Sequence, residues 1–141
     1  MSWLTELRVG VAGATAAESN GLITFTRSGA YLASQLGVYG TILPEAPDEA
    51  ISLVVGVVSE DIETVARASF RYRATTDSRL DMIEDALSNS WVKRQAGTLS
   101  GVAVIMAQWS SGASLGQDGN GRLIRSANFY ITANRPLSNR T

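Results

Sequence analysis

Residues 114–121 are the part of the sequence best suited to hold a cation or a phosphate group. The segment SLGQDGNG places the oxygen-bearing side chains of Asp118 and Asn120 among glycines. A calcium loop needs oxygen ligands at further alternate positions and a bidentate glutamate at its twelfth position. Here Arg122 takes the next alternate position, and no such glutamate follows. A phosphate-binding loop would end in Gly-Lys-Ser/Thr and lead into a helix, whereas this loop leads into a strand pattern.

The same residues have the composition of a tight turn. Asp and Asn side chains accept hydrogen bonds from nearby backbone amides, and glycine adopts positive φ without strain. We therefore predict a turn between two strands, with no bound metal and no cofactor. Its structural residues are expected to be Gly116, Asp118, Asn120 and Gly121.

Enzymatic chemistry lacks its usual residues. The chain has no histidine and no cysteine, which removes disulfides and the Ser-His and Cys-His nucleophile pairs. Clustered carboxylates occur in two polar stretches, where nothing in the pattern indicates an apolar pocket that would shift a pKa. These clusters are Glu60, Asp61 and Glu63, and Asp81, Glu84 and Asp85. We therefore predict no catalytic residue and no enzymatic activity.

Arginines recur at alternate positions of one predicted strand. In TVARASFRYRATT, Arg67, Arg71 and Arg73 fall on the face opposite Phe70 and Tyr72. Because an unpaired buried charge is prohibitive, these arginines must be solvated, paired or turned toward a partner. Three interpretations stay open: a subunit interface, a plain solvent face, or a surface facing DNA. The aromatic side chains that stack on bases are missing from that face of the strand.

Charge is distributed unevenly along the chain. Its net charge is −1, yet residues 1–66 hold two basic and eight acidic residues, and residues 67–141 hold ten basic and five acidic ones. Such asymmetry suits head-to-tail contact between copies. We predict that Arg67, Arg71 and Arg73, on an edge or near-edge strand, meet acidic residues of the next copy. The acidic members of this predicted interface are Asp48, Glu49, Glu60 and Asp61.

Apolar periodicity predicts one α+β domain over residues 1–141. Its expected sheet is mainly antiparallel with about four to five strands, packed against one long helix and an N-terminal helix. Ser2 is expected to cap the N-terminal helix, and Asp77 or Ser78 the long one. Residues 27–38 are expected to form a loop with one possible helical turn. No apolar run approaches the length of a membrane helix, and the N-terminal segment is interpreted as part of the fold rather than a targeting signal. One core is expected to contain Val54, Phe70, Leu87, Ile105 and Phe129.

Three stretches together resemble one protein family. They are TILPEAPDEAISL (41–53), ASFRYRATTDSRLDMIEDALSNSW (68–91) and SLGQDGNGRLIRSANFYITANRP (114–136). They resemble, respectively, a proline-framed turn before an apolar strand, a basic strand followed by a helix, and an Asn-aromatic-aromatic strand that closes on Arg-Pro. The family is that of the tail terminator proteins of long-tailed bacteriophages, also labelled minor capsid or minor tail proteins.

The resemblance implies a structural virion protein. On this family's pattern the chain forms a hexameric ring that caps the completed tail tube, stops its polymerisation and presents a surface for joining the head. The implied partners are further copies of the chain, the tail tube (major tail) protein and a head–tail connector or stopper protein. Genomic DNA passes through such a ring without sequence-specific binding. The implied location is the neck of the virion, with assembly in the host cytoplasm. The alternatives are a head-closure or tail-completion protein, and a small nucleic-acid-binding module.

Overall fold

In the computed structural model, Ser2 caps helix α1 (Trp3–Ala17), as the sequence predicts. Its hydroxyl oxygen accepts a hydrogen bond from the Thr5 amide at 3.1 Å, which satisfies one of the free donors at the helix start. The helix ends before residues 20 and 21, which both adopt positive φ. The structure describes residues 2–60, 63–91, 95–99 and 102–134, with the side chains of residue 90 and of residues 95–111 not described.

Helix α2 (Asp77–Trp91) begins where the sequence predicts, but its capping residue differs. Thr76 takes that position: its hydroxyl accepts from the Arg79 amide at 3.2 Å, and its carbonyl accepts from the Leu80 amide. Asp77 lies instead in the first turn, where a carboxylate is favoured by the helix dipole. One apolar stripe of α2, at helical spacing, is buried against the sheet. Its members are Leu80, Ile83, Leu87 and Trp91.

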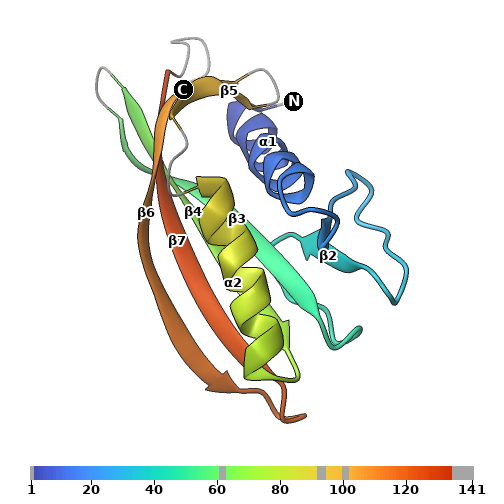
Figure 1. Ribbon diagram of the computed structural model, residues 1–141. Helices are drawn as coiled ribbons and strands as arrows, with labels where there is room; N and C mark the ends of the chain where they lie inside the picture. The colour runs from blue at the N-terminus through green and yellow to red at the C-terminus, as the bar shows by residue number, and fades with distance from the viewer. Residues whose placement is uncertain (1, 61–62, 92–94, 100–101, 135–141) are drawn as a thin grey trace.

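The strands form one mixed sheet in the order β1-β2-β3-β4-β7-β6-β5 (Figure 1). Their bounds are β1 (Ile23–Thr24), β2 (Leu36–Tyr39), β3 (Ala50–Glu60), β4 (Thr64–Ala74), β5 (Gln95–Leu99), β6 (Val102–Gln117) and β7 (Leu123–Ala133). The α+β class is therefore confirmed, but the sheet has more strands than the four to five predicted. It is also mixed, because β1 pairs with β2, and β2 with β3, in parallel. The extra strand β2 lies largely in the region expected to be a loop. It has only four residues, which is too short for an alternating pattern to stand out in the sequence.

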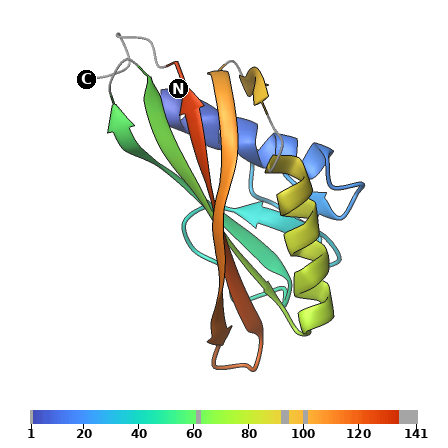
Figure 2. The same cartoon turned by 60° about the vertical axis from the view of Figure 1, so that its left-hand side comes forward.

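Both helices lie on one face of the sheet, which is named here the inner face (Figures 1 and 2). They are joined to each other by a hydrogen bond from the indole Nε1 of Trp91 to the Thr15 hydroxyl at 2.9 Å. On the central strands, alternate residues point inward and are fully buried, as period-2 patterning requires. These inward residues include Ala66, Ala68, Phe70 and Tyr72 of β4, and Ala127, Phe129, Ile131 and Ala133 of β7.

The predicted core is confirmed at Phe70, Leu87 and Phe129, which share one buried cluster. Val54 was predicted wrongly: it is 42% exposed, and Leu53 takes the buried place. The reason is strand register, because Leu53 pairs with inward-facing Phe70, while Val54 pairs with Ser69 on the opposite face. The side chain of Ile105 lies outside the described residues.

Candidate assembly surface

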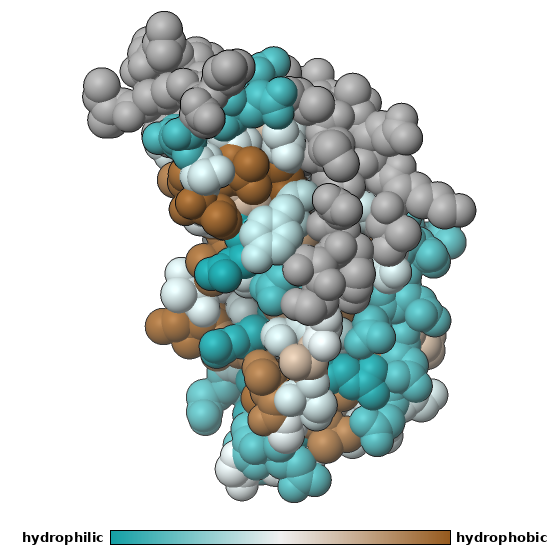
Figure 3. Space-filling view, turned by 90° about the vertical axis from the view of Figure 1, so that its left-hand side faces the viewer, coloured by the Kyte–Doolittle hydropathy of each residue, from teal (hydrophilic) through white to brown (hydrophobic). Residues whose placement is uncertain are grey.

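The face of the sheet opposite the helices, named here the outer face, carries Arg67 and Arg71. Both side chains are exposed, in alternation with the buried inward residues of β4. No ion pair or hydrogen bond joins either arginine to another described side chain. Figure 3 looks onto this side of the molecule, where apolar groups in brown lie among strongly hydrophilic groups in dark teal. Neither α1 nor α2 covers this face.

The strand that carries these arginines is central, not at or near an edge as predicted. β4 hydrogen-bonds along its whole length to β3 on one side and to β7 on the other. The sequence pattern of one strand does not reveal its neighbours, and the β4 alternation would look the same at an edge. Arg67 and Arg71 are therefore exposed on the outer face and do not lie along a free strand edge.

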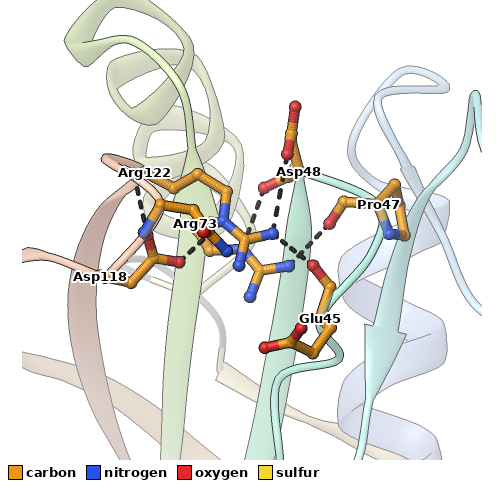
Figure 4. A network of polar contacts seen from close by, with 7 residues as sticks. Glu45, Pro47, Asp48, Arg73, Asp118 and Arg122 are labelled. Atoms are coloured by element: carbon orange, nitrogen blue, oxygen red, sulfur yellow. Dashed lines mark hydrogen bonds and ion pairs between the residues drawn. The ribbon is translucent and has the colours of Figure 1, made fainter.

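Arg73 differs from the other two arginines, because it is buried, with only 3% of its surface exposed. Its guanidinium donates to the backbone carbonyls of Asp48, from Nε at 3.0 Å, and Pro47, from Nη2 at 2.7 Å. Burial first, and then the neighbouring Arg122 guanidinium, lower the pKa of Arg73. Arg73 thus holds the loop before β3 against the end of β4 (Figure 4). It is not part of the exposed outer face.

Arg122, which the sequence analysis did not predict as a structural residue, lies beside Arg73 and is 6% exposed. Its Nε donates to the Asp118 carboxylate at 2.7 Å, and its Nη1 donates to the Glu45 carbonyl. The Asp48 carboxylate lies 3.7 Å from the same Nη1. Two buried arginines therefore fasten three separate segments together: the loop before β3, the end of β4 and the turn between β6 and β7 (Figure 4).

The acidic residues predicted to face a neighbouring copy have partners within the same chain in two cases. Asp48 belongs to the arginine network just described. Glu49 forms a two-point ion pair with Arg79, both contacts being 2.7 Å, the geometry that a guanidinium and a carboxylate prefer. Glu60 is exposed at the end of β3, and Asp61 lies outside the described residues. Of the predicted interface, Arg67 and Arg71 form the exposed part without a partner among the described residues.

Residues 116–122 form a turn that is stabilised by hydrogen bonds among its own residues. The Asp118 carboxylate accepts from the backbone amides of Asn120 at 2.9 Å and Arg122 at 3.0 Å. Gly116 and Gly121 have φ values of +84° and +75°, which side chains with a Cβ rarely adopt. Desolvation of Asp118 opposes ionisation, but the amides of Arg122 and Asn120 and the Arg122 guanidinium outweigh it and lower the pKa of Asp118.

The charge of Asp118 makes the stability of this turn depend on pH. Because the folded-state pKa is below the ordinary value of 3.8, the stabilisation is complete above about pH 4 and is lost as pH falls through the folded-state pKa. Asp118→Asn is therefore expected to reduce stability at pH 7, and the difference from the unaltered chain should shrink below pH 4. Urea denaturation of both proteins between pH 2.5 and 7 measures this. A constant difference at all pH values would mean that shape, not charge, accounts for the loss.

A second polar cluster attaches α2 to the sheet. Arg125 of β7 contacts Asp81 at 2.7 Å and Asp77 at 3.2 Å, and the Tyr72 hydroxyl donates to Glu84 at 2.7 Å. Burial, followed by that hydrogen bond, raises the pKa of Tyr72. Part of the acidic cluster of α2, Asp81 and Glu84, is therefore paired with side chains of the sheet. The sequence signal for these contacts is the i, i+4 spacing of Asp77 and Asp81. This spacing places both carboxylates on one side of the helix, where a single arginine can contact both.

An aromatic residue does lie on the outer face, contrary to the expectation from β4 alone. Arg67 is the register partner of Tyr130 on β7, and Tyr130 is half-buried beside the inward-facing Phe129 and Ile131. A cation and an aromatic ring from neighbouring strands therefore share this surface. The sequence of one strand could not show this, because the aromatic ring comes from a strand 63 positions along the chain (Tyr130 less Arg67).

Among the described residues, no group of three or more acidic side chains is arranged to hold a metal ion. Neither α1 nor α2 is both long and apolar enough to cross a membrane.

Comparison with known proteins shows a structural likeness only. No protein-family model matches the sequence, and no curated protein matches it significantly. The fold is similar to that of a chain in the structure described as the virion of a native gene transfer agent (GTA) particle, with a TM-score of 0.59. The likeness covers 92% of this chain and 95% of that chain, at 13% sequence identity. The chain therefore has, over nearly its full length, the same fold as a protein chain of a virion particle.

Proposed function

We propose that the protein is a structural component of a phage-like virion: a ring-forming tail terminator. Copies of the chain form a ring that covers the growing end of the tail tube, stops its polymerisation and offers a different surface to the head. The observation that carries this proposal is the fold shared with a virion chain across nearly the whole of both chains. The resemblance of residues 41–53, 68–91 and 114–136 to tail terminator proteins points to the specific role.

The outer face supports an assembly role. The helices cover one side of the sheet, and the other side presents Arg67 and Arg71 together with Tyr130 and the exposed Val54. Mixed apolar, aromatic and arginine surface is the composition that protein interfaces favour. The two ends of a ring of such subunits are unlike, so one end can cover the tube and the other can stay free for a further partner.

The test is to add the purified chain to tail tube protein during polymerisation, and to measure particle mass with and without tubes. A terminator forms a ring of defined mass at the tube end, and tube growth stops. A head-closure or tail-completion protein would leave the length of growing tubes unchanged. Unrestricted tube growth in the presence of folded chain would contradict the proposal.

The arginines of the outer face are expected to point toward the channel of the ring. Arg73, Asp48 and Glu49 have partners inside the same chain. These three residues are therefore not free for the predicted contact between basic and acidic residues of neighbouring copies. Replacing Arg67 and Arg71 together by glutamate should leave the fold intact, because exposed substitutions change stability by about 0.5 kcal/mol or less. Rings and tail length should be normal, and passage of DNA should be impaired, because glutamates repel the phosphate backbone.

Electron microscopy of tails made with this variant, together with infectivity, measures the outcome. The matched control is the double change to lysine, which keeps the charge and should keep infectivity. Overlong or unjoined tails would place the two arginines at the contact between copies instead. Normal, infectious tails would contradict both placements. Arg73 is left unchanged because its replacement would break the buried network.

A small nucleic-acid-binding module is the second candidate, favoured by the pairing of Arg67 with Tyr130 across β4 and β7. Arginine and aromatic side chains on one sheet face can hold phosphates and stack bases. A salt titration of DNA binding distinguishes the two functions. A binding module loses affinity steeply as salt rises, whereas a ring component shows little binding as a free chain.

A further inference from the structure

The sheet has two strands that are only half paired, one toward each edge. β2 pairs with β3 only at Ile51 and Ser52, so residues 53–59 of β3 have no partner on that side among the described residues. β5 pairs with β6 only from Val102 to Met106, so residues 107–117 of β6 have no partner on that side within the part of the chain that the structure describes. Unpaired backbone amides and carbonyls along a strand are a template for a further strand.

Each free segment contains a bulge or register shift, between Val57 and Ser59 in β3 and at Trp109/Ser111 and Ser114/Gly116 in β6, but neither has the charges or prolines that protect many edge strands. Residues 53–59 (LVVGVVS) and 107–117 (AQWSSGASLGQ) contain no charged residue and no proline, the two features that most often block edge pairing. The first segment includes Val54 and Val58, 42% and 53% exposed, and the second includes Leu115, 48% exposed. Exposed aliphatic side chains on a free edge indicate that the edge is covered in the assembled state.

There is room for a strand beside β3. Where β2 leaves β3, a hollow of about 460 Å³ opens. It is lined by residues 53–55 of β3, by residues 38–41, by the segment after β1 and by Arg8 and Val9 of α1. At Gly56, in the middle of the free segment, an added Cβ would point to the outer face and would meet no atom within 4 Å. The outer face of this segment is therefore open as well.

The directions of the two strands fit each other in neighbouring copies. β3, β4, β7 and β6 are joined by three antiparallel pairings, so β6 runs opposite to β3. A rotation about an axis inclined to the strands would bring β6 of one copy beside β3 of the next in antiparallel orientation. Because the two edges are different surfaces on opposite sides of the sheet, such a contact is head-to-tail and can close into a ring.

We propose that copies of the chain join by antiparallel pairing of residues 53–59 of one copy with residues 107–117 of the next. This inference rests on the proposed ring and identifies the surfaces through which it closes. Both segments belong to this same chain. Their pairing would give hydrogen-bond partners to the unpaired backbone amides and carbonyls of both.

The register of the contact follows from the positions of the free segments. Gly56, the centre of the first, aligns across β4 with Tyr130 of β7, whereas Gly112, the centre of the second, aligns with Ala127. Gly56 lies on the outer face, and Ala113, next to the centre of the second segment, lies on the same face and aligns with Ser126. Opposing Gly56 and Ala113 therefore requires an offset of four residues (Tyr130 less Ser126), about 13 Å along the strands, the kind of stagger that a closed, tilted sheet requires.

Cysteine cross-linking tests this arrangement, since the chain has no cysteine of its own. Gly56→Cys and Ala113→Cys are introduced together, and the protein is oxidised gently during assembly. Within one chain the two positions are separated by three strand spacings, about 14 Å, which is beyond the reach of a disulfide. Neighbouring copies should therefore be linked into a ladder of covalent oligomers that ends at the mass of the ring. The control pairs Ser69→Cys, on central strand β4, with Ala113→Cys and should give no ladder.

Hydrogen exchange of the unaltered protein provides a second measurement that does not depend on the variants. Assembly should increase protection of amides in residues 53–59 and 112–117. A ring of normal mass with neither cross-links nor added protection would overturn the edge contact and leave the proposed function standing. A ladder from a chain that fails to stop tube growth would support the contact and contradict the function. A chain that stays monomeric with tubes present would overturn both.

Discussion

Replacing Phe129 by alanine is expected to lower the free energy of unfolding by about 3–5 kcal/mol. The Phe129 ring is fully buried and lies between Phe70, at 5.5 Å in an edge-to-face arrangement, and Trp91, at 5.7 Å. Truncation removes the transfer free energy of the ring and leaves a cavity among side chains from β4, β7 and α2. These elements are held by their own hydrogen bonds and cannot collapse fully into the space.

Urea denaturation followed by tryptophan fluorescence measures this effect, at concentrations where the chain is monomeric. The matched control is Tyr130→Ala, the next residue of β7, which lies on the outer face and is only half-buried. It should cost clearly less than Phe129→Ala. A loss below about 1 kcal/mol for Phe129→Ala would mean that the two faces of β7 are reversed.

Replacing Arg122 by methionine is expected to cost about 1–3 kcal/mol, the range for leaving buried polar groups without their partners. The methionine side chain retains much of the volume but no donor. The Glu45 carbonyl then loses its guanidinium, and the Asp118 carboxylate keeps only backbone donors. The loop before β3 and the turn between β6 and β7 then lose the side chain that connects them.

Arg122→Lys is the control for charge, because lysine keeps the cation but cannot donate in two directions from a planar group. It should recover only part of the lost stability. Combined with Asp118→Asn, Arg122→Met should destabilise by less than the sum of the two single changes, since both remove the same contact. Strict additivity, measured by urea denaturation of the four proteins, would show that the two side chains do not interact.

The sheet-edge contact and the arginine network have separate effects on the molecule. The network of Arg73 and Arg122 ties together segments of one chain at the end of the sheet where β4 leads into α2. The free segments of β3 and β6 extend beyond the short strands β2 and β5. Variants of the network should therefore lower monomer stability, whereas variants of the free segments should change assembly at unchanged stability. Measuring both properties for each variant separates folding from ring formation.

Local patterns in the sequence were sufficient to predict the helices and the central strands. Ser2 before an apolar-periodic segment predicts α1, and the spacing of Leu80, Ile83 and Leu87 predicts the buried side of α2. The strict alternation of β4 predicts its inward residues. These features depend on contacts between residues close in the chain and on the fixed periods of helix and strand. They can therefore be recognised in a single sequence.

Parallel strands and strand order could not be predicted in this way. β2 has four residues, and its partners are parallel strands reached through loops, so no turn chemistry marks the pairing. Val54 was placed in the core because β3 is apolar on both faces, and a strand of that composition does not show which of its faces the helices cover. The pairing of Leu53 with Phe70 determines it.

Arg67, Arg71 and Arg73 show most clearly what only the tertiary structure decided. By period the three are equivalent, and the sequence alone determined that they share the face opposite Phe70 and Tyr72. Arg67 and Arg71 remain exposed. Arg73 is buried because the loop before β3 and the turn that contains Asp118, from residues 25 and 45 positions away, cover the end of β4. The physical reason is that a buried guanidinium needs hydrogen-bond acceptors to offset its loss of water. Here the acceptors are the carbonyls of Pro47 and Asp48, which only the folded chain brings within reach.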